Sequence, residues 1–121
     1  MSDLTWAGVL VLGGLGAVAR FLLDAVTSQR VGRDFPAGTL AINLSGAFLL
    51  GLLTGAGASG NSSVLAGTAT IGSFTTFSTW MLETHRLVED GDRRDAIVNV
   101  VVSLAVGLLA AAAGRAIGGQ L

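Results

Sequence analysis

The chain has 121 residues, enough for one domain, with a formal net charge of -1 and no cysteine. Apolar residues make up 51% of it, charged residues make up 12%, and the mean hydropathy is +0.71. Soluble domains carry about 25% charged residues. The composition therefore excludes disulfides and thiolate metal sites, offers no basic surface for nucleic acid, and favours a membrane protein over a hydrophobic subunit of a soluble complex.

Four apolar stretches follow one another, each long enough to cross a bilayer as a helix, which takes about 20 residues. The first is not a signal peptide, because it starts with the acidic Asp3 and three similar stretches follow. The stretches run from about 4 to 26, 37 to 58, 63 to 88 and 96 to 117, with connections at 27–35, 57–62 and 89–95. The sequence predicts an all-α integral membrane protein, with one four-helix transmembrane domain over 1–121.

Small and polar residues recur at every fourth position in the second and fourth stretches, which places them on one face of each helix. Small residues let helices approach closely in lipid, so the glycines and alanines are interpreted as packing seams. Asn43 and Ser103 need a further explanation, because an amide or a hydroxyl at membrane depth is costly without a partner. The two stripes are Asn43, Ala47, Gly51 and Gly55, and Asn99, Ser103, Gly107 and Ala111.

The third stretch is the least typical membrane helix. Gly72 interrupts it, and five hydroxyl side chains lie within residues 73–79. Hydroxyls can bond to carbonyls one turn earlier and merely bend a helix. So many of them instead favour a polar path along a helix that is broken in mid-membrane, and unwound backbone at that depth survives only where protein or a cavity surrounds it.

Two charged residues, Arg20 and Glu83, fall within predicted spans and are candidates for function. The alternative is that each lies at the end of its helix and extends its charge to the lipid headgroups. His85 is interpreted as a headgroup-level residue. No catalytic constellation, metal-ligand spacing or phosphate loop is present in the sequence, so an enzyme is not expected.

Three local patterns, in this order, give the chain a family resemblance that covers essentially all of it. They are Gly-Gly-Leu-Gly-Ala-Val-Ala-Arg at 13–20, Phe-Pro-Ala-Gly-Thr-Leu-Ala-Ile-Asn-Leu-Ser-Gly at 35–46, and Gly-Ser-Phe-Thr-Thr-Phe-Ser-Thr-Trp at 72–80 followed by Glu83. With them the chain resembles the Fluc/CrcB fluoride channels. The resemblance implies passive export of fluoride through the plasma membrane, and hence fluoride resistance.

The same resemblance implies an antiparallel, dual-topology dimer in lipid, with two pores at its interface and a central structural Na+. The carbonyls of Gly72 and Thr75 match the positions that bind the sodium. One position departs from the family pattern, because Trp80 stands where a second phenylalanine is usual. The residues implied at the fluoride pore are Thr39, Asn43, Phe77, Ser78, Thr79, Trp80 and Ser103.

The arginines are distributed unevenly between the two ends of the predicted bundle. Cytoplasmic loops carry an excess of basic residues, so this split predicts that both termini lie outside. A chain that inserts in both orientations is expected to have balanced arginines, which leaves a homodimer and a heterodimer with a homologous subunit of opposite bias both open. The end that contains the first and third connections carries Arg30, Arg33, Arg86, Arg93 and Arg94. The end that contains both termini and the second connection carries Arg115.

Two other functions are alternatives to a channel. A small proton-coupled multidrug exporter also has four helices, but it needs a carboxylate deep in its first helix, where this chain has no glutamate. A scaffold subunit without transport activity would leave the hydroxyls and aromatic rings around the broken helix unexplained. Fluoride efflux from liposomes would discriminate the three.

Overall fold

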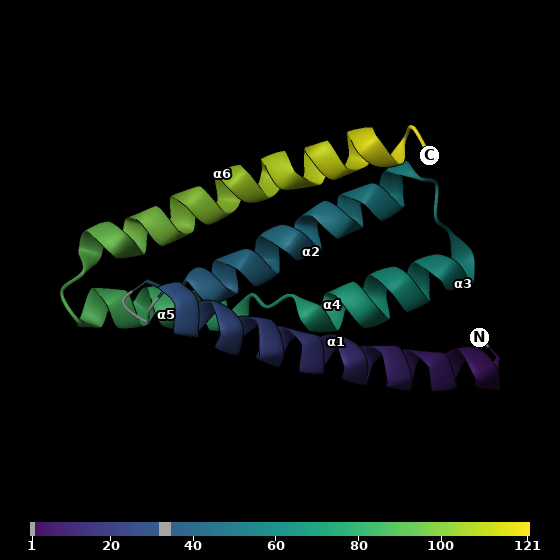
Figure 1. Cartoon of the computed structure of the whole chain (residues 1–121), viewed down its shortest axis with the longest axis horizontal. Helices are drawn as coiled ribbons and strands as arrows, with labels where there is room; N and C mark the ends of the chain where they lie inside the picture. Colours follow the sequence, from purple (N-terminus) through teal and green to yellow (C-terminus); the bar gives the residue numbers. More distant parts are fainter. Residues whose placement is uncertain (1, 32–34) are drawn as a thin grey trace.

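The computed structural model describes residues 2–31 and 35–121, and every regular element in these two ranges is helical. The long helices are α1 (Asp3–Val31), α2 (Ala37–Gly55) and α6 (Arg93–Gly118). Between α2 and α6 the chain forms α3 (Gly60–Ser62), η1 (Ser63–Ile71), α4 (Gly72–Phe74) and α5 (Ser78–Glu89). Figure 1 shows these elements running lengthwise beside one another, with the α3-to-α5 segment adjoining α1.

In the described part of the chain, three helices are long and apolar enough to cross a membrane. They cover Asp3–Arg30, Ala37–Gly55 and Arg93–Gly118. The predicted third span does not form one helix, because α3, η1, α4 and α5 divide it. The prediction of an all-α membrane protein with an interrupted third passage is confirmed at this level.

Several helix ends differ from the predicted ones. α1 continues to Val31, into the stretch 27–35 that was predicted as a loop, and α2 ends at Gly55 rather than near 58. The end of α2 has a local cause: Gly57 has a φ of +83°, and the N–H groups of Gly57 and Ala58 donate to the carbonyls of Thr54 and Leu53. This is a glycine C-cap of the Schellman type, which satisfies the last carbonyls of a helix. Gly91, with a φ of +85°, caps α5 in the same way.

The helix ends fall into two groups at opposite ends of the molecule. Both termini and the α2–α3 connection lie at one end, and the end of α1 and the α5–α6 connection lie at the other (Figure 1). Arg30, Arg86, Arg93 and Arg94 belong to helix segments at this second end, while Arg115 lies near the C-terminus. Arg33 lies outside the described residues.

Glycines let α2 and α6 approach each other closely. A Cβ on Gly51 would collide with the carbonyl oxygen of Ala111, and one on Gly114 would collide with the carbonyl oxygen of Phe48. The backbones of the two helices can approach this closely only where the residue at the contact is a glycine. The predicted packing seam is therefore confirmed at Gly51 and Ala111.

The interruption of the third passage begins later than predicted. Gly72 is helical, with φ −60° and ψ −40°, and its N–H donates to the carbonyl of Gly67 at the end of the π-helical segment η1. The backbone leaves the helix at Thr75, whose ψ of 161° is extended, and α5 starts at Ser78. The expectation that Gly72 makes the break is wrong, because the chain unwinds where a side chain from α2 binds its backbone, as the site below shows.

Candidate functional site

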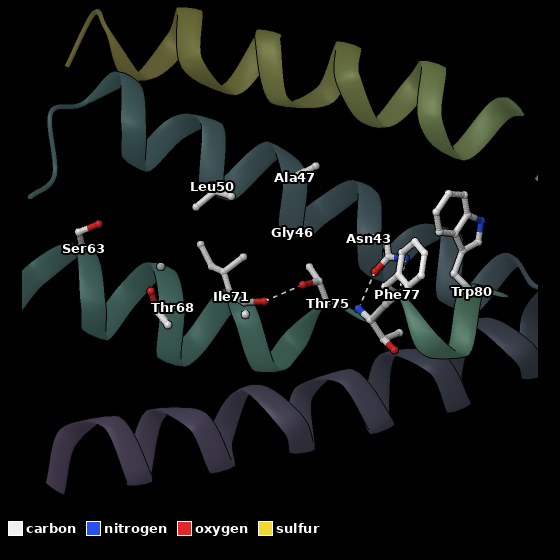
Figure 2. Close-up of a pocket in the computed structure, with 13 residues that line it drawn as sticks. Asn43, Gly46, Ala47, Leu50, Ser63, Thr68, Ile71, Thr75, Phe77 and Trp80 are labelled. Atoms are coloured by element: carbon white, nitrogen blue, oxygen red, sulfur yellow. Dashed lines mark hydrogen bonds between the residues drawn. The ribbon is translucent and has the colours of Figure 1, made fainter. Parts of the chain in front are cut away.

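The break is held by the side chain of Asn43, which lies on α2. Its Nδ2 donates to the carbonyl of Thr76 and its Oδ1 accepts from the N–H of Thr76, both at 2.9 Å. The amide thus replaces the two hydrogen bonds that a helix would provide to the N–H and the carbonyl of Thr76, so both backbone groups of this residue are satisfied outside a helix. Figure 2 shows the Asn43 side chain extending from α2 to the unwound backbone between α4 and α5.

This pairing changes the environment of the carbonyls just before the break. In a continuous helix the N–H of Thr76 would donate to the carbonyl of Gly72. It donates to Asn43 instead, which leaves the Gly72 carbonyl without its usual donor. At Thr75 the backbone is extended, so the carbonyl of this residue does not point along a helix axis. The turn therefore presents backbone oxygens that are not committed to helical hydrogen bonds.

A cavity of about 540 Å³ lies along this turn between α2 and the broken helix (Figure 2). Five of the residues singled out from the sequence line it: Asn43, Gly72, Thr75, Phe77 and Trp80. The rings of Phe77 and Trp80 form an edge-to-face pair, with centroids 5.6 Å apart and planes at 78°. Phe77 is 70% exposed, so its ring stands at the open side of the cavity.

Three further sequence-predicted residues meet in a second cavity, of about 210 Å³, on the α1 side of the break. Arg20, Thr39 and Thr79 line it together with Thr76. Thr76 also lines the larger cavity. The unwound turn therefore lies between two cavities, one with aromatic rings and one with an arginine, an aspartate (Asp24) and several hydroxyls.

Thr76 is the central residue of the site, although the sequence analysis assigned it no role beyond membership of the hydroxyl cluster. Its backbone N–H and carbonyl pair with Asn43. Its Oγ1 accepts from the N–H of Thr79 at 3.2 Å and donates to the Thr79 hydroxyl at 3.1 Å. A hydroxyl that accepts from the N–H three residues later is a helix N-cap interaction. The signal that could have found it is a threonine placed just before a new run of helix formers.

Thr39 and Glu83 are brought together across 44 positions of sequence. The Thr39 hydroxyl donates to the Glu83 carboxylate, and Thr39 is only 2% exposed. Glu83 also borders a cavity of about 370 Å³ that contains Arg86 and three aspartates, Asp90, Asp92 and Asp95. The pair joins α2 to α5 at the end of the bundle opposite the termini.

Ser78 and Ser103 complete the predicted set. Ser78 is exposed at the first position of α5, and its hydroxyl lies 3.5 Å from that of Thr76. Ser103 lies on α6, away from the two cavities at the break. Its hydroxyl is buried and has no hydrogen-bond partner in the described part of the chain. An unpaired buried hydroxyl is rare in a stable fold and calls for an explanation.

Comparison with known proteins identifies the family. Residues 7–115 match the family described as CrcB-like protein, Camphor Resistance (CrcB). The chain belongs to the CrcB family. A relative in Mycolicibacterium paratuberculosis, named fluoride-specific ion channel FluC 2, is 52% identical over 110 residues, which are 91% of this chain and 90% of the relative.

Two more distant CrcB relatives carry similar names. Fluoride-specific ion channel FluC 1 of Symbiobacterium thermophilum is 44% identical, over 95% of this chain and 98% of its own. Fluoride-specific ion channel FluC 1 of Rubrobacter xylanophilus is 43% identical, over 98% of this chain and 96% of its own. The CrcB family is one of ion channels, so the chain is not an enzyme.

Proposed function

We propose that the chain forms a channel through which fluoride leaves the cell passively across the plasma membrane. The names of relatives that match more than nine-tenths of the chain support fluoride as the ion. The observation that carries the proposal is the Asn43–Thr76 pair, which holds an unwound, hydrogen-bonded turn between two cavities.

Fluoride is small and strongly hydrated, so a pore must replace its water with close donors. The Asn43 amide has two N–H donors, and its recorded bond to Thr76 uses one of them. The second is the donor that we assign to the ion. The Thr79 and Ser78 hydroxyls extend this polar path along α5. The buried Ser103 hydroxyl, which lies away from both cavities, would join the path only in the assembled dimer.

The aromatic residues have a different role in the proposal. A ring is positive at its edge and negative on its face, so an anion is attracted to the edge. Phe77 and Trp80 stand at right angles beside the cavity, which lets at least one edge face the ion path. The path therefore combines neutral donors with ring edges.

The residues at the break also fit a structural sodium ion. Sodium is a hard cation that prefers oxygen ligands, and the Gly72 carbonyl has lost its helical donor while Thr75 follows an extended conformation. The carbonyls of Gly72 and Thr75 would hold the ion. Bound there, it would supply fixed positive charge near the anion path. In a dimer it would also link the broken helices of the two subunits.

The large cavity supports a dimer. It is open on the face of the molecule where the Phe77 ring is exposed, and a second subunit on this face would enclose it. We propose an antiparallel dimer with two pores along the interface, formed either by two copies of this chain or by this chain and a homologous subunit of opposite arginine bias. Arg20 lines the cavity on the α1 side together with Asp24, so this cavity holds one charge of each sign.

Fluoride efflux from liposomes tests the function directly. The purified chain should release fluoride without a proton gradient, and Asn43→Asp and Phe77→Ile should each reduce the rate strongly. Asn61→Asp, an exposed site on α3, introduces the same charge away from the path and should leave the rate unchanged. No efflux from the unmodified chain, either alone or together with such a homologous subunit, would refute the channel, and efflux from both pore variants equal to that of the unmodified chain would contradict the assigned path.

A further inference from the structure

A closed set of three hydrogen bonds joins Trp80 on α5 to α6. The indole Nε1 of Trp80 donates to the backbone carbonyl of Asn99 at 3.3 Å. The Asn99 side chain donates through Nδ2 to the Thr84 hydroxyl at 2.8 Å, and that hydroxyl donates to the Trp80 carbonyl at 2.8 Å. Each residue of the set therefore binds the next, and the set returns to Trp80.

The burial of Asn99 indicates that these bonds are obligatory. Asn99 is 1% exposed and, with Ile42, is among the largest fully buried side chains of the described residues. A buried amide without a partner is destabilising, so Asn99 needs the Thr84 hydroxyl. Thr84 alone would be ordinary, because a threonine on a helix often donates to the carbonyl four residues earlier. Its second bond, to another helix, is the unusual part.

These hydrogen bonds fix the orientation of the Trp80 indole. Trp80 lines the large cavity, and Figure 2 shows its ring extending from α5 toward α6 beside Phe77. Its only polar atom is Nε1, and that atom is bound to α6. The ring carbons, rather than the N–H donor, are therefore presented to the cavity and to Phe77.

We propose that Thr84 and Asn99 are positioning residues for Trp80, which hold its N–H on α6 and so set the ring orientation that the permeating anion meets. This inference rests on the proposed channel function. A released indole would turn its donor into the cavity, where a hydrogen bond to the anion slows its departure, and conduction requires binding weak enough for the ion to leave.

The chain offers a spectroscopic test, because it has only two tryptophans, Trp6 and Trp80. In a Trp6→Phe background, time-resolved fluorescence anisotropy reports the mobility of Trp80 alone. We expect Thr84→Val to increase the fast depolarisation and to lower fluoride efflux about fivefold, a typical coupling within one hydrogen-bonded network. Thr84→Ser should restore both values, because it retains the hydroxyl.

Two controls separate positioning from general damage. Thr54 makes the same local bond to the carbonyl four residues earlier, at 2.9 Å, but it is exposed and has no recorded partner on another helix, so Thr54→Val should change neither readout. In a Trp80→Phe background there is no indole N–H to hold, so Thr84→Val should change efflux by less than about twofold.

The possible results decide the proposal. If Thr84→Val lowers efflux equally with Trp80 and with the Trp80→Phe substitution, the threonine acts only through general stability and the proposal is wrong. Unchanged depolarisation in Thr84→Val would also overturn it. If the unmodified chain releases no fluoride, the channel function fails, while the anisotropy of Trp80 still decides whether Thr84 holds the indole.

Discussion

The side-chain amide of Asn43 pairs with the backbone N–H and carbonyl of Thr76 through two hydrogen bonds of 2.9 Å, one in each direction. A side chain from a different helix thus satisfies both backbone groups of one residue. It holds the backbone open at Thr75–Phe77 and places Thr76 between the two cavities, both of which it lines.

Asn43→Leu should therefore destabilise the fold itself, not only impair transport. It removes both partners of the Thr76 peptide group, and an unpaired buried polar group costs about 1–3 kcal/mol. We expect a loss of that size in the free energy of unfolding in detergent, measured by denaturant titration. Asn61→Leu, at an exposed position on α3, is the matched control. Equal stability of the two variants would show that the pair does not hold the break.

Thr39 and Glu83 should behave as a coupled pair. Thr39→Val leaves the Glu83 carboxylate without its recorded donor, and a hydrogen bond to a charged group contributes about 1.5–3 kcal/mol. We expect Thr39→Val and Glu83→Gln each to lower the unfolding free energy, and the double variant to lower it by less than the sum. A double-mutant cycle measures this difference. Strictly additive effects would mean that the contact contributes nothing.

The glycine seam between α2 and α6 predicts a sharp contrast between glycines. Gly51→Ala and Gly114→Ala place a methyl group against carbonyl oxygens of the facing helix, and such overpacking costs about 1–3 kcal/mol. Gly14→Ala meets nothing within 4 Å and should be neutral or slightly stabilising. Thermal unfolding in detergent compares the three. A similar melting temperature for all would exclude close packing of α2 on α6.

Removal of sodium should abolish fluoride efflux if the ion holds the break. Channels purified and assayed in N-methylglucamine salts should be inactive, and return of Na+ should restore efflux. Thr75→Val should keep the same sodium dependence, because the proposed ligand is the backbone carbonyl and not the hydroxyl, which donates to the Ile71 carbonyl at 3.1 Å. Full efflux in thoroughly sodium-free conditions would remove the ion from the proposal.

The arginine distribution predicts one predominant orientation for the chain expressed alone, with both termini outside. Four described arginines belong to the end of the bundle opposite the termini, and Arg115 belongs to the other end. Basic residues are retained on the cytoplasmic side. Labelling of terminal tags in intact cells measures the orientation. Equal populations of both orientations would identify a homodimer, and one orientation would require a homologous partner.

Much of the architecture could be predicted from the sequence because its causes are local. Apolar stretches of sufficient length define membrane helices in any context, and the two stripes of small residues, which include Gly51 and Ala111, follow from the repeat of the helix. The hydroxyl cluster after Gly72 correctly indicated an interrupted third passage, although it placed the start of the break too early.

Only the tertiary structure decided where the break lies and which groups act together. The Thr76 peptide unwinds because Asn43 reaches it from α2, across 33 positions of sequence, and Thr39 meets Glu83 across 44. Likewise Trp80 is bound by α6 through Asn99. Hydropathy and helix periodicity describe one segment at a time, so they determined the helices of this protein. The partners of its buried polar groups come from other helices, and only packing brings them within hydrogen-bond distance.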